Sequence, residues 1–226
     1  MIRVRAVLPA LLCLALGFVP IAGVAAEPQA EAPVEGRDYV VVEGVQPWGA
    51  ADGRIEVLEV FAYTCGHCEE FQPVLSAWAR KLPDDVRFEY LPAAYDLGNA
   101  FARGFFAARA ENAVERVHAP LYRAVHHDGL LANNATIDEV AWFLGEHGLD
   151  KAAAKATMAS PAVDALMQRA RDFQLGIRLR GTPTLVVDGR YVVTPRTHQD
   201  ALRITGQLVD RLRSGALPRA TRTPME

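Results

Sequence analysis

The feature that most constrains the fold is an apolar strand that leads directly into two cysteines. Residues 54–62 are apolar and β-branched, which is typical of a strand buried on both faces. Cys65-Gly-His-Cys68 follows almost at once, and Phe71 and Leu75 then recur at helical spacing. Thiols three positions apart can close a disulfide only where the backbone turns. The pattern therefore predicts a strand, a cysteine pair at a helix start, and a helix.

The number of cysteines indicates why the pair is present. The chain has three cysteines, and Cys13 lies in an N-terminal segment. We expect residues 1–26 to be a signal peptide, because arginines, an apolar stretch and small residues follow in that order. A retained membrane anchor is the alternative. Once the signal is removed, only Cys65 and Cys68 remain, and so short a loop adds little stability. We expect a redox-active disulfide.

The expected helix start assigns different roles to the two thiols. Cys65 would lie beside free backbone N–H groups and the positive end of the helix dipole, which favour the nucleophilic thiolate. His67 could add a positive charge or a hydrogen bond. Cys68, one turn into the helix, would be more buried and would close the disulfide. Glu59 lies in the apolar strand, where burial would raise its pKa and let it exchange protons with Cys68. An exposed or ion-paired Glu59 is the alternative.

A second candidate site lies far along the chain. Thr182 and Pro183 directly precede an expected strand over residues 184–187. Proline at a strand entry indicates a cis peptide bond or a sheet edge. A cis bond would leave neighbouring backbone groups free to pair with an extended peptide, so both residues are candidate substrate-binding residues. An ordinary loop proline is the alternative.

The remaining pattern indicates an α/β fold with two halves, βαβ and ββα, separated by an all-α insertion over about residues 97–176. We expect a flexible leader over 27–38, one domain over 39–214 and a frayed tail over 215–226. Further strands are expected over 39–42, 85–91 and 190–193, and a last helix over 198–213. Within the insertion, helices are expected over 99–118, 120–127, 137–147, 151–158 and 161–175.

Composition and spacing disfavour other chemistries. The formal net charge is −3 with no basic run, so we expect no nucleic-acid partner. Zinc would need further ligands at finger-like spacing, and covalent haem would need a histidine where Glu69 stands, so no metal or cofactor is expected. The histidines at 118, 126, 127 and 147 are expected on the surface. Trp78, Trp142 and the phenylalanines of 101–106 are expected in the core.

Together these features resemble the thioredoxin superfamily and, within it, the bacterial periplasmic DsbA-type oxidoreductases. The resemblance spans residues 39–213. It rests on the CGHC motif with Glu59 upstream, the helical insertion, and Arg180-Gly-Thr-Pro183 before a strand. It implies a thioredoxin fold in which Pro183 is cis and packs against the disulfide. Two positions depart from the best-known members: Gly66 replaces proline, and Thr182 replaces valine.

The resemblance also implies a function. It describes a monomeric periplasmic oxidoreductase that donates disulfide bonds to reduced, unfolded exported proteins and is reoxidised by a DsbB-like membrane quinone reductase. By analogy with related couples, we expect a reduction potential of roughly −100 to −180 mV. A disulfide isomerase or reductase of the same fold is the alternative. A peptide-binding or chaperone module with a structural CxxC, or a metallochaperone, would be a different class of protein.

Overall fold

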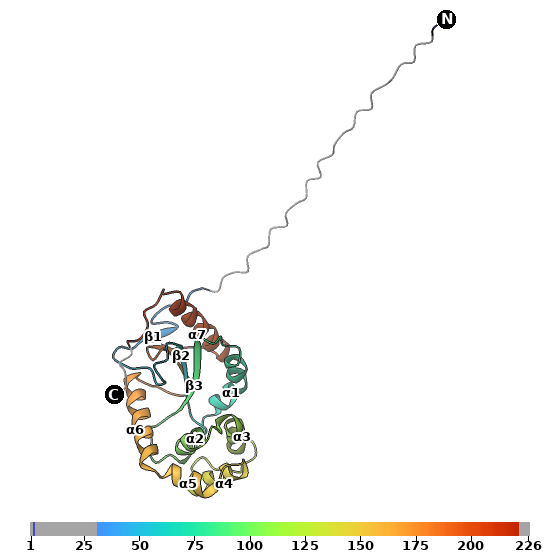
Figure 1. Ribbon diagram of the computed structural model, residues 1–226, viewed down its shortest axis with the longest axis vertical. Helices are drawn as coiled ribbons and strands as arrows, with labels where there is room; N and C mark the ends of the chain where they lie inside the picture. Colours follow the sequence, from blue (N-terminus) through green and yellow to red (C-terminus); the bar gives the residue numbers. More distant parts are fainter. Residues whose placement is uncertain (1, 3–30, 222–226) are drawn as a thin grey trace. The chain divides into compact units, whose positions relative to one another are not determined.

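The computed structural model describes residue 2 and residues 31–221. The expected signal peptide, apart from residue 2, lies outside the described residues. The described residues from 32 to 221 belong to one compact unit, and the fold described here is the fold of that unit. Its elements in chain order are β1 (Tyr39–Val41), β2 (Ile55–Phe61), α1 (Gly66–Ala79), β3 (Val86–Pro92), α2 (Ala100–Ala110), α3 (Val114–His126), α4 (Ile137–Glu146), α5 (Lys151–Met158), α6 (Pro161–Gly176), β4 (Thr184–Val187), β5 (Tyr191–Val193) and α7 (His198–Arg213) (Figure 1).

A five-stranded mixed sheet forms the centre of this unit, with the strand order β1-β5-β4-β2-β3. β2 pairs with β3 in parallel and with β4 in antiparallel orientation, so Glu59 lies between Tyr90 and Leu185. All seven residues of β2 are buried, as its apolar composition predicts. α1 and α7 pack together over one face, where Val57 joins Phe71 and Ile204 in one hydrophobic cluster. The α/β class with an all-α insertion is confirmed.

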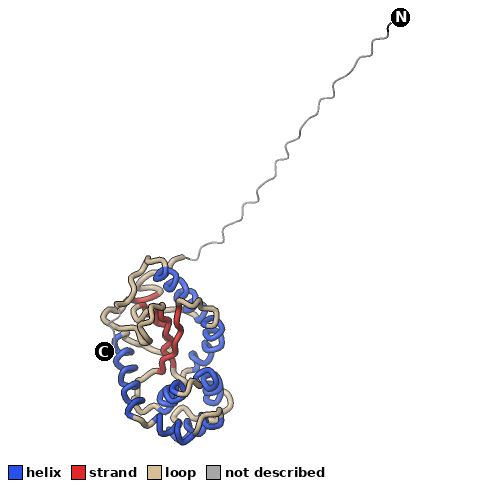
Figure 2. Tube along the Cα trace, viewed as in Figure 1, coloured by secondary structure: helices blue, strands red, loops and turns tan. Residues whose placement is uncertain are grey.

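The insertion consists of α2 to α6: α2 to α5 are grouped beyond one end of the sheet, and α6 runs back along its side (Figure 1 and Figure 2). Its core is large and apolar, with Phe106, Met158 and Met167 fully buried. Gly104 of α2 permits a close helix contact, because a Cβ atom there would lie 2.6 Å from Cγ1 of Val140 on α4. The insertion is therefore packed as tightly as a conventional helical core.

Two of the helix limits expected from periodicity are wrong. The structure replaces the expected helices over 99–118 and 120–127 with α2 and α3, which are divided near residue 112. Asn112 has a φ of 52°, a left-handed conformation that ends α2 and that asparagine tolerates better than most residues. Pro120 lies inside α3 instead of starting a helix. The neighbours Val117 and Leu121 are buried, so tertiary packing maintains the helix despite the missing N–H group.

Three further expectations are also wrong. His118 is buried, with 3% of its surface exposed, instead of lying on the surface. Trp142 is 39% exposed, because the core-facing side of α4 is occupied by other residues, such as Phe143. The segment after α7 is held in place as far as Ala220. The backbone N–H of Ala220 donates to Asp188, which also accepts from Arg219.

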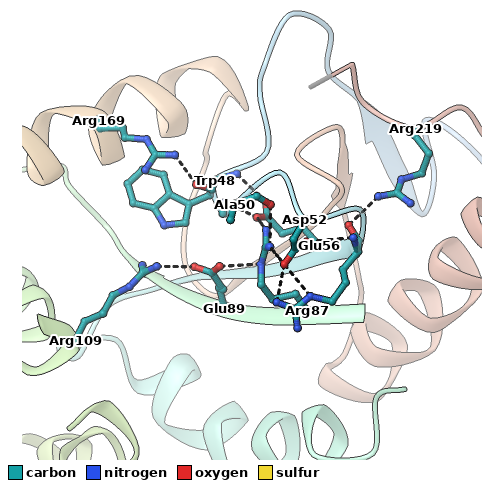
Figure 3. Close-up of polar contacts among 11 residues, drawn as sticks. Trp48, Ala50, Asp52, Glu56, Arg87, Glu89, Arg109, Arg169 and Arg219 are labelled. Carbon is teal, nitrogen blue, oxygen red and sulfur yellow. Dashed lines mark hydrogen bonds and ion pairs between the residues drawn. The ribbon is translucent and has the colours of Figure 1, made fainter. Parts of the chain in front are cut away.

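A buried charge network supports the sheet at the start of β2 (Figure 3). Glu56 is fully buried and accepts hydrogen bonds from the Trp48 backbone N–H at 2.8 Å and from Arg87 at 3.0 Å. Arg87 also pairs with Asp52 at 2.7 Å and with Glu89 at 2.9 Å. Because the carboxylate of Glu56 is fully paired, its burial is compatible with a stable fold.

Candidate active site

The two cysteines lie at the junction of β2 and α1. Cys65 is the N-cap of α1, with extended backbone angles, and its N–H donates to the carbonyl of Ala62 at 3.1 Å. The N–H groups of Cys68 and Glu69 both donate to the carbonyl of Cys65 at 3.1 Å. Both thiols are free, Cys65 partly exposed and Cys68 fully buried. The expected strand–CGHC–helix arrangement is confirmed, and the accessible thiol is Cys65.

The surroundings shift the pKa values of the two thiols in opposite directions. The hydrogen bond with the Cys68 thiol lowers the pKa of Cys65 to about 5, with help from the backbone N–H groups of Cys68 and His67. The same sulfur–sulfur hydrogen bond raises the pKa of Cys68, as do its burial and the charge of Glu59. At neutral pH, Cys65 is therefore the thiolate and Cys68 the thiol.

The distant Thr182-Pro183 segment lies beside Cys65. The Sγ atom of Cys65 approaches the carbonyl oxygen of Thr182 to 3.2 Å, where the thiol form can donate a hydrogen bond. The peptide bond between Thr182 and Pro183 is cis. β4, which begins at Thr184, pairs with β2 and thereby brings the two segments together. Both candidate substrate-binding residues thus border the reactive sulfur.

Glu59 occupies the buried position that its place in the strand indicates. It is 1% exposed, and its Oε1 atom has no hydrogen-bond partner among the described residues. Burial raises the pKa of Glu59 to about 8, and negative charge at Cys65 adds to this effect. At neutral pH the carboxyl group is therefore mostly protonated, which suits a group that gives a proton to a neighbouring sulfur.

The imidazole of His67 points away from the sulfurs. Its side chain is 81% exposed, and its Nδ1 atom lies 3.7 Å from Glu70. The backbone N–H group of His67 stabilises the Cys65 thiolate. Of the six sequence candidates, the structure gathers Cys65, Cys68, Glu59, Thr182 and Pro183, and leaves the His67 ring in solvent.

Sequence reasoning missed a buried polar group beside the site. The hydroxyl of Tyr63, two residues before Cys65, lies 2.8 Å from Nδ1 of His118 on α3. Burial lowers the pKa of His118 to about 3, so this imidazole is neutral. His118 stands near Leu121 and Tyr122 at helical spacing, a signal that could have placed it on a buried face. Its pairing with Tyr63 is long-range and left no local signal.

Residue 2 and residues 31–221 hold neither a metal cluster nor a membrane-spanning helix. In that part of the chain no three His, Cys, Asp or Glu residues are grouped so that they could hold a metal ion. Nor does any helix there have the length and apolar character needed to cross a membrane.

Comparison with known proteins identifies the family. The model of the DSBA-like thioredoxin domain matches residues 94–204. The thiol:disulfide interchange protein DsbA of Azotobacter vinelandii is 35% identical over 183 residues, which cover 79% of this chain and 84% of that protein. Among solved structures, Xylella fastidiosa DsbA is 39% identical, with a TM-score of 0.78 over 81% of this chain and 100% of that one. Pseudomonas aeruginosa DsbA is 31% identical, with a TM-score of 0.73 over 80% of this chain and 95% of that one. The chain therefore belongs to the DsbA family of thiol:disulfide oxidoreductases, built on a thioredoxin fold with a helical insertion.

Proposed function

We propose that this protein donates its Cys65–Cys68 disulfide to newly exported, reduced proteins in the periplasm. The observation that carries the proposal is the low pKa of Cys65, about 5, beside the raised pKa of Cys68. The surroundings stabilise the Cys65 thiolate, which exists only when the pair is reduced. They therefore favour the reduced pair over the disulfide. The pair therefore tends to take electrons from substrate thiols, which is the property of an oxidant.

The proposed reaction has two exchanges. A substrate thiolate attacks the Cys65 sulfur of the oxidised protein, the Cys65–Cys68 bond breaks, and Cys68 leaves and takes up a proton. A second substrate thiolate then attacks the substrate sulfur of the mixed disulfide and expels Cys65 as a thiolate. The substrate gains a disulfide, and the protein is left with two electrons in its reduced pair. The low pKa of Cys65 makes it a good leaving group in the second step.

Glu59 and the Thr182 segment have distinct proposed roles. Glu59 gives a proton to Cys68 as that sulfur leaves, because Glu59 is buried, has a pKa of about 8 and raises the pKa of Cys68 through its charge. Thr182 and Pro183 bind the substrate backbone next to Cys65, since the Thr182 carbonyl lies 3.2 Å from the reactive sulfur. The backbone N–H of His67, with Cys68, stabilises the thiolate.

The proposed cycle needs an external oxidant. Each donated disulfide leaves Cys65 and Cys68 reduced, so a two-electron oxidant must restore their disulfide before the next cycle. We propose a DsbB-like membrane quinone reductase for this step, and we propose that the protein acts as a monomer.

The test is the reduction potential of the pair in glutathione buffers. We expect roughly −100 to −180 mV, and the protein should oxidise a reduced dithiol peptide stoichiometrically, with Cys65→Ser as the inactive control. A potential at or below about −200 mV would instead indicate a reductase or isomerase. Alkylation at pH 6 separates the chaperone alternative, because a merely structural Cys65 would react slowly.

A further inference from the structure

Two histidines of α3 contact Tyr63, which lies two residues before Cys65. His118 contacts the Tyr63 hydroxyl through Nδ1 at 2.8 Å, and His126 approaches the Tyr63 carbonyl oxygen through Nε2, also at 2.8 Å. The two histidines belong to the same helix of the insertion, whereas Tyr63 follows the central strand β2. One helix therefore fixes both the side chain and the backbone of a residue two positions before Cys65.

The contact from His126 has a defined polarity. A carbonyl oxygen only accepts hydrogen bonds, so the Nε2 atom of His126 must carry the hydrogen and donate it to Tyr63. His126 is partly buried and lies beside the ring of Tyr122, at a centroid distance of 6.3 Å. The ring is thus held between α3 and the active-site turn with its donor aimed at the backbone.

A second contact joins the residue after α3 to the residue after the cysteine pair. The Nε2 atom of His127 lies 2.7 Å from Oε1 of Glu69, the residue after Cys68. This pair is more exposed than the contact from His126, with side-chain exposures of 58% and 26%. Exposed pairs contribute little, so the contact from His126 is the better candidate for a positioning role.

The orientation of the turn determines where the Cys65 sulfur lies. The N–H of Cys65 donates to Ala62, and its Sγ atom lies 3.2 Å from the carbonyl of Thr182. The carbonyl of Tyr63 belongs to the same turn, because Tyr63 lies between Ala62 and Cys65 in the sequence. Rotation of that peptide plane would move the sulfur relative to the Cys68 thiol and the N–H groups at the start of α1.

We propose that His126 is a positioning residue for thiol exchange, which fixes the Cys65 sulfur by donating a hydrogen bond to the Tyr63 carbonyl. The proposal rests on the proposed role of Cys65 as the exchanging thiol. It gives the helical insertion a direct part in the chemistry, because the donor comes from α3.

Three variants test the proposal. His126→Leu removes the donor, and His126→Gln supplies an amide N–H group that can replace Nε2. His147→Leu is the matched control, because Nδ1 of His147 contacts the Phe143 carbonyl at 2.9 Å within its own helical segment, near the end of α4. The rate of iodoacetamide reaction at Cys65 is measured at pH 4 and pH 6 by mass spectrometry. The reduction potential is measured in glutathione buffers, and the unfolding midpoint by circular dichroism.

We expect His126→Leu to slow alkylation of Cys65 at pH 4 about tenfold and to make the potential more reducing. Loss of one hydrogen bond to the turn should lower the acidity of Cys65 about tenfold, and at pH 4 the alkylation rate follows that acidity directly. His126→Gln should recover the rate to within about threefold, and His147→Leu should stay within about twofold of the unaltered protein. An unchanged rate in His126→Leu would overturn the proposal. A glutamine variant as slow as the leucine variant, with an unchanged unfolding midpoint, would overturn it too.

The two proposals fail in different ways. If the unaltered protein itself is alkylated slowly at pH 6, the proposed oxidant function fails. If the unaltered protein reacts fast at pH 6 and His126→Leu matches its rate at pH 4, only the positioning role fails. Should the leucine variant not fold, the nitrogen chemical shifts of ¹⁵N-labelled histidine in the unaltered protein decide: we expect His126 protonated at Nε2 at pH 8, and a bare Nε2 would refute the donor role.

Discussion

Replacement of Glu59 by glutamine should make the reduced protein more stable, although it removes a proposed proton donor. Burial raises the pKa of Glu59 from 4.5 to about 8. Between these two values the folded protein holds a proton that the unfolded chain has released, so its stability falls as the pH rises. The accumulated cost is about 3 kcal/mol at pH 7 and about 5 kcal/mol above pH 8. Glutamine has the same shape and does not ionise, so Glu59→Gln should remove this cost.

The assay is urea unfolding of the reduced proteins at several pH values from 4.5 to 8. The gain of Glu59→Gln over the parent should be near zero at pH 4.5 and about 3 kcal/mol at pH 7. Glu56→Gln is the matched control on the same strand: its carboxylate is buried but paired with Arg87, so it should lose several kcal/mol. A pH-independent difference between Glu59→Gln and the parent, or a loss of stability at pH 7, would refute the reasoning.

Three further outcomes are expected. The reduction potential of the pair should fall by about 59 mV per pH unit below pH 5 and by about 30 mV per unit above it, because reduction takes up two protons when Cys65 is a thiol and one when it is a thiolate. Glutathione titrations from pH 4 to 7 measure this slope. A single slope over that range would contradict the low pKa of Cys65. Glu59→Gln should slow formation of the mixed disulfide at pH 7 at least tenfold, roughly the scale of general-acid catalysis, in stopped-flow reduction by a peptide thiol. Gly104→Val should cost about 1–3 kcal/mol in urea unfolding, since its side chain would collide with Val140, whereas no loss would mean that α2 and α4 can separate freely.

Composition and spacing were enough to predict the elements that depend on short stretches of the sequence. The strand before the cysteines, the helix start at Gly66 and the last helix over 198–213 follow from composition and spacing, and the structure has them at nearly the same residues. The burial of Glu59 also followed, because its neighbours on both sides are apolar. These features depend on short stretches of chain, in which propensity and periodicity point the same way.

The remaining features depend on contacts between distant residues. The end of α2 depends on the left-handed backbone of Asn112, which asparagine permits but does not require. The contact between Tyr63 and His118 spans 55 residues, and the contact between Cys65 and Thr182 spans 117. No periodicity encodes such pairings. His67 shows the opposite case: it lies between the two cysteines in sequence and its backbone N–H group stabilises the Cys65 thiolate, but its ring points to solvent.

The sheet order has a consequence for a chain that is synthesised from one end to the other. The centre of the sheet pairs Val57 with Val187, and the entire helical insertion lies between them in the sequence. Contacts of such long sequence separation form late. While the chain is emerging, the helix start that brings the Cys68 thiol and the backbone N–H groups to the Cys65 sulfur is not yet fixed. Cys65 then behaves as an ordinary, weakly acidic thiol. The oxidising power of the protein arises only when folding is nearly complete, so an unfinished molecule is a substrate for disulfide exchange before it becomes an agent of it.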